Sequence, residues 1–219
     1  TFDRTQKIVP DYLREAHYKI ANLLYQEGQY PESIESFKTA IKLFNESGYH
    51  RTGVDKIMKE AKISKKTLYR YFRTKEELIL ACLQYYDSSF RNEFIKKVEK
   101  IASTPKEKLL AIFEVANDWF MQEHFFGCMF INAIGEYSET DNPIRDICKH
   151  FKTQVRRFIE QLCVEAGVKN AEDLAAQIAL LFEGAIVTAQ IAKQSDAAKV
   201  AQQAAQILIE THTQISHQQ

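Results

Sequence analysis

The sequence is poor in the residues that interrupt helices. Its 219 residues include seven glycines and four prolines, and this scarcity favours long helices joined by short links. No apolar run approaches the roughly 18 residues of a membrane-spanning helix, and no signal-peptide pattern opens the chain. We therefore expect a cytoplasmic protein without a membrane partner.

Motifs that would indicate catalysis or metal binding are missing as well. The sequence has no G-x-S-x-G, no phosphate-binding glycine loop and no H-E-x-x-H. Its cysteines form no C-x-x-C pair, which argues against a disulfide framework or a zinc module; they are Cys82, Cys128, Cys148 and Cys163. We expect no catalytic residue, no metal site and no cofactor, and hence a protein that is not an enzyme.

The composition is that of an ordinary globular protein, with 45% apolar and 26% charged residues. The net charge is zero, but the charged residues are unevenly distributed. Residues 1–100 hold 19 basic and 14 acidic side chains, and residues 101–219 hold 10 basic and 15 acidic ones. This asymmetry is typical of a basic N-terminal domain joined to a mildly acidic C-terminal one. No segment has a convincing strand pattern, so we predict an all-α fold.

The most informative stretch lies between Thr52 and Lys75. Thr52 is a good N-cap for a short first helix. The helical spacing of apolar residues is interrupted at Lys62. Ser64 can then cap a second helix, which has Leu68 on its apolar face. The first helix carries one apolar stripe, at Val54, Ile57, Met58 and Ala61. Two short helices joined by a tight turn form a helix-turn-helix, whose second helix enters a DNA major groove.

The charge of this stretch agrees with that interpretation. Residues 51–75 contain nine Lys or Arg side chains and two acids, a balance of +7 in a neutral chain. Such a cluster on a groove-sized helix is expected of a protein that displaces counterions from DNA. Charge alone would also suit a solvated basic helical hairpin.

Four motifs, in this order and spacing, resemble the DNA-binding domain of the TetR family of bacterial transcriptional regulators. They are A-I-K-L-F-N-E-S-G-Y (residues 40–49), T-G-V-D-K-I-M-K-E-A (52–61), S-K-K-T-L-Y-R-Y-F (64–72) and T-K-E-E-L (74–78). The match covers roughly residues 33–83. Lys66 departs from the pattern, because the family usually has a small residue, often glycine, at this position.

The resemblance implies an architecture in two parts and a set of DNA contacts. A three-helix helix-turn-helix domain would occupy residues 31–77, preceded by an extra helix within 1–30 and followed by a helical ligand-binding and dimerisation domain at 78–219. Lys65, Thr67 and Tyr69 would lie nearest the bases, and Tyr69 and Tyr71 would also donate to phosphates. The expected DNA-binding set is Thr52, Lys65, Lys66, Thr67, Tyr69, Tyr71 and Lys75, with Thr52 and Lys75 placed at helix N-termini where phosphate is attracted.

Helical periodicity continues to the end of the chain. Thr74 and Glu77 form a capping-box pattern that opens a long helix running to about Ile101, and Pro105 suits the first position of the next helix. Further helices are expected at 106–123, 128–138, 143–166, 171–192 and 196–213. By resemblance, the last two would pair with those of a second subunit, giving a homodimer and a palindromic operator. An intramolecular core is the alternative for these two helices.

The N-terminal part has a competing interpretation. Residues 16–43 also resemble one tetratricopeptide repeat, a helical hairpin around Gly28, Gln29 and Tyr30. No second copy follows, and a single repeat cannot bury its own hydrophobic face. We expect an extra helix at about residues 11–27, packed antiparallel on the next helix as a brace or as an arm near DNA. A helical protein–protein interaction module is the alternative function.

The family commonly binds a small-molecule effector in its helical body, and an aromatic-rich segment is the candidate lining here. The candidate residues are Trp119, Phe120, His124, Phe125, Cys128 and Asn132. Large aromatics with few polar anchors suit a ligand pocket, and they equally suit an ordinary core. Cys128 lies in a G-C-M-F-I-N segment similar to one whose cysteine senses oxidants or electrophiles in some family branches; a buried, inert thiol is the alternative. We expect a dimeric, nucleoid-associated repressor that its effector releases from DNA.

Overall fold

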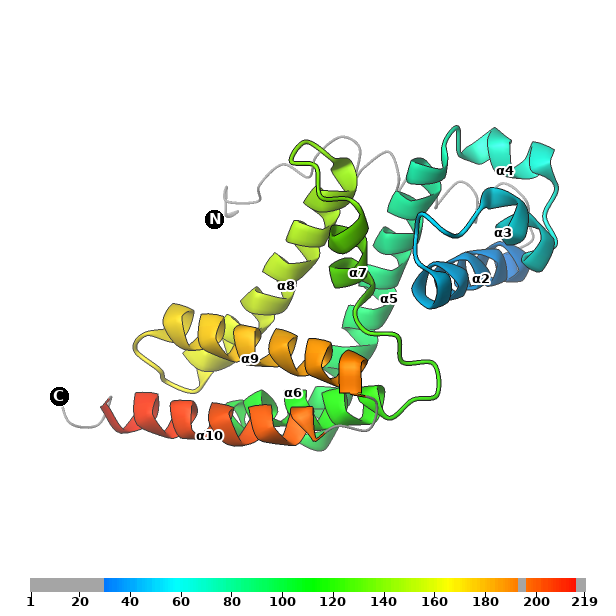
Figure 1. Ribbon diagram of the computed structural model, residues 1–219. Coiled ribbons are helices and arrows are strands. Elements are labelled where there is room, and N and C mark those ends of the chain that lie inside the picture. The colour runs from blue at the N-terminus through cyan, green and yellow to red at the C-terminus, as the bar shows by residue number, and fades with distance from the viewer. Residues whose placement is uncertain (1–29, 193–195, 216–219) are drawn as a thin grey trace. The chain divides into compact units, whose positions relative to one another are not determined.

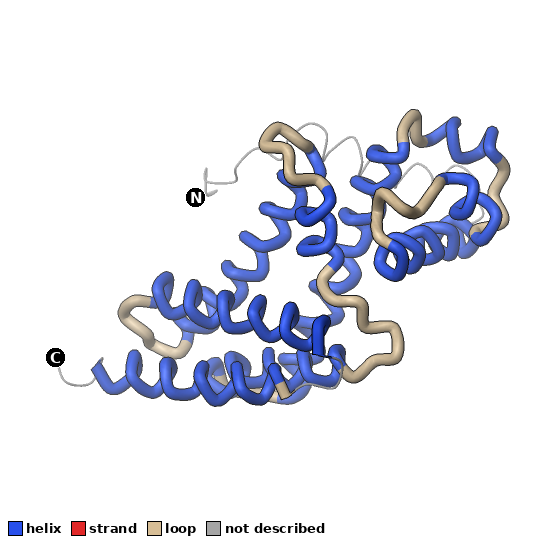
Figure 2. The backbone as a smooth tube through the Cα atoms, in the orientation of Figure 1, coloured by secondary structure: helices blue, strands red, loops and turns tan. Residues whose placement is uncertain are grey.

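A computed structural model describes residues 30–192 and 196–215. Every regular element in these ranges is a helix, which confirms the all-α prediction (Figure 2). The helices are α2 (Tyr30–Ser47), α3 (Val54–Glu60), α4 (Lys65–Tyr71), α5 (Lys75–Ile101), α6 (Pro105–Phe120), α7 (Met129–Glu136), α8 (Pro143–Glu165), α9 (Ala171–Ala192) and α10 (Ala197–Ile215). The helix expected at residues 11–27 lies outside the described residues, as does nearly all of the expected 1–30 extension.

The described residues divide into two compact units. The head unit comprises residues 30–88 and 133–147, and the body unit comprises 89–132 and 148–215 without 193–195. Three helices, α5, α7 and α8, continue from one unit into the other. The chain therefore enters and leaves the head unit more than once, which sequence periodicity does not reveal.

The core of the head unit is aromatic. Phe37 on α2 stacks on Tyr85 with 5.9 Å between ring centroids and meets Phe72 edge-on at 6.1 Å. Phe44 stacks on Tyr49 at 5.3 Å, and Tyr49 is fully buried. Phe72 directly follows α4, so these rings attach α4 to α2 and α2 to α5, whereas α3 is held by its buried Ile57. Such packing is needed, because isolated seven-residue helices are unstable in water.

The body unit is built on long apolar helices. The antiparallel helices α9 and α10 pack side by side, and α6 packs against both (Figure 1). Small residues face inward on both long helices, including Ala175 and Ala185 on α9 and Ala201 and Ala205 on α10. Small side chains bring helix axes close together, so part of the alanine-rich pattern serves the protein's own core.

Most helix ends agree with the sequence predictions. The long helix begins after Thr74 and ends at Ile101, and Pro105 occupies the first turn of α6 behind a capping box made by Thr104 and Glu107. The expected helix 106–123 ends earlier, at Phe120. The chain folds back there, and the ring of Phe125 packs 5.0 Å from that of Phe120.

Helix α9 is long and apolar enough to cross a membrane by length and composition. Of its most apolar 18-residue window, 39% is buried within the protein. One such helix is weak evidence for a membrane span, since core helices of soluble proteins pass the same test. The contacts of α9 with α10 and α6 favour a core helix over a membrane-spanning one.

Candidate nucleic-acid interface

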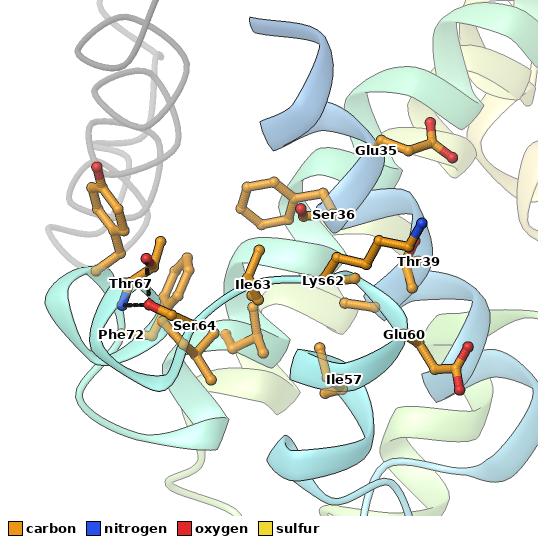
Figure 3. A pocket seen from close by; sticks show the side chains of 16 residues that line it. Glu35, Ser36, Thr39, Ile57, Glu60, Lys62, Ile63, Ser64, Thr67 and Phe72 are labelled. Atoms are coloured by element: carbon orange, nitrogen blue, oxygen red, sulfur yellow. Dashed lines mark hydrogen bonds between the residues drawn. The ribbon is translucent and has the colours of Figure 1, made fainter. Parts of the chain in front are cut away.

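The turn between α3 and α4 is formed by local hydrogen bonds that the sequence specifies. Lys62 adopts the left-handed conformation at φ 55°, and the N–H of Ile63 donates to the carbonyl of Met58 at 3.0 Å. The Ser64 hydroxyl oxygen then accepts the N–H of Thr67 at 3.0 Å, which confirms it as the N-cap of α4 (Figure 3). Leu68, 4% exposed, anchors α4 in the core of the head unit.

One face of α4 is exposed to solvent and positively charged. The exposed side chains are those of Lys65, Lys66, Tyr69 and Arg70, and 43% of the Tyr69 surface is accessible to solvent. The ammonium of Lys65 lies 5.9 Å from the centre of the Tyr69 ring, which is near the limit of a cation–π contact. These side chains form a cationic and aromatic surface on a helix of the width that a major groove admits.

Thr67 and Tyr71 lie at the edges of this surface and are half-buried. The guanidinium of Arg70 stacks over the Tyr71 ring at 4.6 Å and donates to its hydroxyl oxygen. Sequence reasoning did not select Arg70. Its spacing of four residues from Lys66 would have placed both cations on the same side of the helix.

Lys75 lies at the first position of α5, as expected. Its ammonium donates to the carbonyl of His50 at 3.1 Å, so it is attached to the turn that follows α2. The N–H of Glu77 donates to the Thr74 hydroxyl oxygen at 3.2 Å, and the Glu77 carboxylate accepts the N–H of Arg73 at 3.0 Å. These bonds fix the start of α5 beside α4.

Thr52 departs from its predicted role. It is fully buried, and its hydroxyl lies 2.6 Å from the carbonyl oxygen of Gly48 and 3.1 Å from that of Leu43. The N-cap of α3 is Gly53, which supplies no capping side chain, so the N-cap prediction is wrong. Because its hydroxyl is buried and directed at these two carbonyls, the Thr52 side chain ties α2 to the turn and is not presented to phosphate.

An acidic side chain from a distant part of the sequence closes the same turn. The carboxylate of Glu136, at the end of α7, accepts the backbone N–H groups of Tyr49, at 2.7 Å, and of His50. The His50 ring nitrogen Nε2 lies 2.9 Å from the Glu136 carbonyl. Gly48 adopts φ +83°, and a Cβ there would lie 2.9 Å from the Glu136 carboxylate, so the glycine permits this close approach.

The body unit contains a second candidate site, an aromatic cavity between α5, α6, α8 and α9. Its open volume is about 40 Å³, close to that of one water molecule. The lining residues are Phe90, Arg91, Phe94, Ile95, Ile112, Trp119, Cys128, Phe151, Lys152, Val155, Phe158, Ile159, Phe182, Glu183 and Ile186. Lys152 and Glu183 form an ion pair of 3.3 Å at this site, and Arg91 is the third charged residue of its lining.

Two of the six residues expected to bind an effector, Trp119 and Cys128, line this cavity. Four do not: Phe120 and Phe125 pack on one another beside Trp119, and the His124 ring stacks on Phe126. Asn132 joins two segments, because its amide donates to the carbonyl of Phe126 and its side-chain oxygen accepts from Gln190, both at 3.0 Å. Sequence reasoning missed the lining contributed by α5, α8 and α9.

None of the four cysteines has the exposure that a reactive thiol needs. All four cysteines are free and buried, and burial raises the pKa of the Cys82 thiol far above its usual value. Cys128 is 4% exposed, which favours the interpretation of a buried, inert thiol. No group of three metal-ligating side chains occurs in the described part of the chain.

Two family models match the chain. "Bacterial regulatory proteins, tetR family" matches residues 37–82, and "Tetracyclin repressor-like, C-terminal domain" matches residues 105–205. The first covers the helix-turn-helix, and the second covers most of the body unit and most of the residues that line its cavity.

Several curated relatives are transcriptional regulators, YxaF and YuxN of the HTH type. YxaF of Bacillus subtilis is 30% identical over 154 residues, which are 68% of this chain and 80% of YxaF. AcuR of Cereibacter sphaeroides is 27% identical over 168 residues, 73% of this chain and 76% of AcuR. YuxN of Bacillus subtilis is 31% identical over 148 residues, which are 67% of this chain, so the match spans only half the length of YuxN.

Solved structures show the same fold. A TetR-family transcriptional regulator from Streptomyces coelicolor superposes with a TM-score of 0.75 at 21% identity, covering 92% of this chain and 98% of its own. Regulatory protein TetR from Rhodobacter sphaeroides gives 0.70 at 24% identity, covering 80% and 96%. Helix-turn-helix geometry, family models, relatives and fold agree: the chain belongs to the TetR family, whose members are cytoplasmic, dimerising, DNA-binding transcriptional regulators and not enzymes.

Proposed function

We propose that this chain is a homodimeric, sequence-specific regulator that binds a palindromic operator and leaves it when a small apolar effector occupies the body unit. Repression is the activity we favour, with the protein associated with the nucleoid while it is bound to DNA. The observation that carries the proposal is the exposed cationic and aromatic face of α4.

That face divides by chemistry into two kinds of contact. Lys65 and Lys66 lie in the first turn of α4 and Tyr69 lies one turn later, and all three would reach base edges in the major groove. Tyr71 and Lys75 lie toward the start of α5 and suit phosphates, which set register without reading sequence. Thr67 is half-buried, so its side chain would extend less far toward the DNA than those of its neighbours. Arg70 adds a phosphate or base contact to the expected set.

The apolar residues left exposed on the last two helices support a dimer. Leu180, Val187 and Ile191 on α9 expose 74%, 38% and 80% of their surfaces, and Val200 and Ile207 on α10 expose 55% and 65%. Large apolar side chains gathered on two packed helices mark an interaction surface. A second copy of the chain would cover them with its own α9 and α10, and its α4 would then read the other half of a palindrome.

The cavity of the body unit suggests the class of effector. Its lining is almost entirely apolar and aromatic, with Arg91, Lys152 and Glu183 as polar anchors. At about 40 Å³ it is far smaller than the roughly 300–1,000 Å³ of occupied ligand sites. An apolar effector would therefore have to separate α5, α8 and α9, and α5 continues to Lys75 in the head unit.

Selection of bound sequences from a random duplex library, at two salt concentrations, tests the proposal. We expect a palindrome to be enriched and affinity to fall steeply as salt rises, because each phosphate contact releases counterions. Weak and unselective binding by a protein shown to be dimeric by sedimentation would contradict the assignment. It would favour the alternative, a helical protein–protein interaction module.

A further inference from the structure

A chain of hydrogen bonds in the head unit runs from the end of α7 to Lys75, the expected phosphate contact. It begins at Glu136, the last residue of α7, whose carboxylate accepts the backbone N–H groups of Tyr49, at 2.7 Å, and of His50. It continues through the carbonyl oxygen of His50, which accepts the Lys75 ammonium at 3.1 Å. One residue, His50, therefore connects the Glu136 carboxylate to the Lys75 side chain.

The end of α7 holds His50 at several points. The two oxygens of the Glu136 carboxylate are used separately, Oε1 by Tyr49 and Oε2 by His50. The ring nitrogen Nε2 of His50 lies 2.9 Å from the Glu136 carbonyl oxygen. The ring of Tyr137, the next residue, lies 4.7 Å from that of His50 between centroids. Because the backbone and the ring of His50 are both held, the direction of its carbonyl is fixed from α7.

A fixed carbonyl matters for Lys75 because a lysine side chain is long and flexible. Its ammonium stands on a four-carbon stem and has three N–H donors. The His50 carbonyl uses one donor, so two can still be donated to a phosphate. Ordering the stem before DNA arrives reduces the conformational entropy that is lost on binding. The bond to His50 thus orients the ammonium and keeps it available for a phosphate.

We propose that Glu136 is a positioning residue for DNA binding: through His50, it holds the Lys75 ammonium where a DNA phosphate can accept it. The inference rests on the proposed function, because it requires that Lys75 contacts a phosphate. Charge alone gives the opposite expectation. An acidic side chain in a DNA-binding unit repels phosphates, so its removal would strengthen binding. The sign of the effect therefore separates positioning from simple electrostatics.

The salt dependence of DNA binding by the full chain tests the proposal. The probe is a duplex of mixed sequence and about 30 base pairs, or three helical turns, since phosphate contacts do not read sequence. Glu136→Gln removes the charge and one acceptor oxygen, and Lys75→Ala removes the phosphate contact itself. We expect both variants to bind more weakly. Both should reduce the slope of log affinity against log salt by about 2 per dimer, at about 0.9 for each of two contacts.

The double variant and a matched acid complete the comparison. Glu136→Gln combined with Lys75→Ala should reduce the slope no further than Lys75→Ala does, because both changes remove the same contact. Glu139 is exposed and lies three residues after Glu136, beyond the end of α7. Glu139→Gln removes the same charge, and we expect it to keep the slope of the parent and to bind no more weakly.

The possible failures are distinguishable. A parental slope in Glu136→Gln, beside a reduced slope in Lys75→Ala, would overturn this inference and leave the proposed function intact. A parental slope in Lys75→Ala would overturn the inference as well, since Lys75 would then contact no phosphate. A parent whose DNA binding does not respond to salt would overturn both the inference and the proposed function.

A substitution without a charge change guards against a general loss of folding. Gly48 adopts φ +83°, and a Cβ there would lie 2.9 Å from the Glu136 carboxylate, so Gly48→Ala displaces that carboxylate. Gly167 adopts φ +76° and has open space around an added Cβ. Gly167→Ala therefore imposes similar backbone strain, in the turn between α8 and α9, without touching the turn at His50.

We expect only Gly48→Ala to reduce the slope, even where both glycine variants are less stable than the parent. The slope reports the folded molecules, because a constant inactive fraction lowers the affinity by the same factor at every salt concentration. Equal slopes in Gly48→Ala and Gly167→Ala would contradict the positioning role of Glu136.

Discussion

The head and body units are stabilised by different kinds of contact. In the head unit, the seven-residue helices depend on an aromatic core and, in addition, on turn hydrogen bonds, the Ser64 cap and the carboxylate of Glu136. In the body unit, helices of 16 to 27 residues depend on buried rings and close-packed alanines. The comparison suggests that polar contacts position the DNA-facing helix, whereas apolar burial supplies most of the stability of the body unit.

The largest effect should come from removing a ring in the body unit. Phe113 is 1% exposed and meets Phe182 edge-on with 6.4 Å between centroids. Phe113→Ala should lower the free energy of unfolding by about 3–5 kcal/mol, because it leaves a cavity. Urea denaturation measures this change. The exposed neighbour Asp118→Ala serves as control, and a loss below 1 kcal/mol for Phe113→Ala would show that the unit repacks.

Next in size is a change that should affect recognition and leave stability unaltered. Lys65→Ala should relax base preference at one position of each half-site, at a cost of about 1–3 kcal/mol in binding to the preferred sequence. The side chain is exposed, so the urea midpoint should stay the same. Selection from a random library compares Lys65→Ala with Lys59→Ala, an exposed control on α3. An unchanged selected sequence would remove Lys65 from the base-reading set.

Two caps of the same chemistry sharpen the comparison between the units. Ser64→Ala and Thr104→Ala each remove a side-chain oxygen that accepts a backbone N–H at a helix start, and each should cost about 1 kcal/mol of stability. Only Ser64→Ala should also weaken operator binding, because it loosens α4. Denaturation and binding isotherms test both variants. Equal binding losses would contradict the separation of roles.

The smallest effect is expected at Tyr137 in the head unit. Its hydroxyl is buried and finds no hydrogen-bond partner among the described residues. Burial, with Glu76 and Glu136 nearby, raises its pKa from 10 to about 12. The neutral phenol is therefore favoured by folding, and stability should fall as pH rises from about 10 through 12.

Tyr137→Phe should be nearly neutral at pH 7, because it removes an unpaired polar group. It should reduce the alkaline loss of stability between pH 10 and 12. Urea titrations at pH 7 and pH 11 measure both quantities. A variant as sensitive to alkali as the parent would show that other groups cause the loss.

Local signals in the sequence predicted much of the fold. Ser64 and Pro105 act within one helical turn, so their patterns were sufficient. The cavity was harder to predict, because Phe90 and Phe182 come together only through tertiary packing. Thr52 was assigned wrongly, since its hydroxyl is used by carbonyls of α2 and the following turn that no local pattern reveals. Glu136 could not be foreseen, because its partners are 86 and 87 residues away.

That last contact has a consequence for the order of folding during synthesis. The turn at Tyr49 and His50 leaves the ribosome early, but Glu136, which accepts its N–H groups, follows 86 residues after His50. At about 5–20 residues per second, the delay is roughly 4–17 s. Throughout that interval the nascent helix-turn-helix lacks one of its closing contacts. The helix-turn-helix therefore receives this contact only after α5, α6 and α7 have been synthesised.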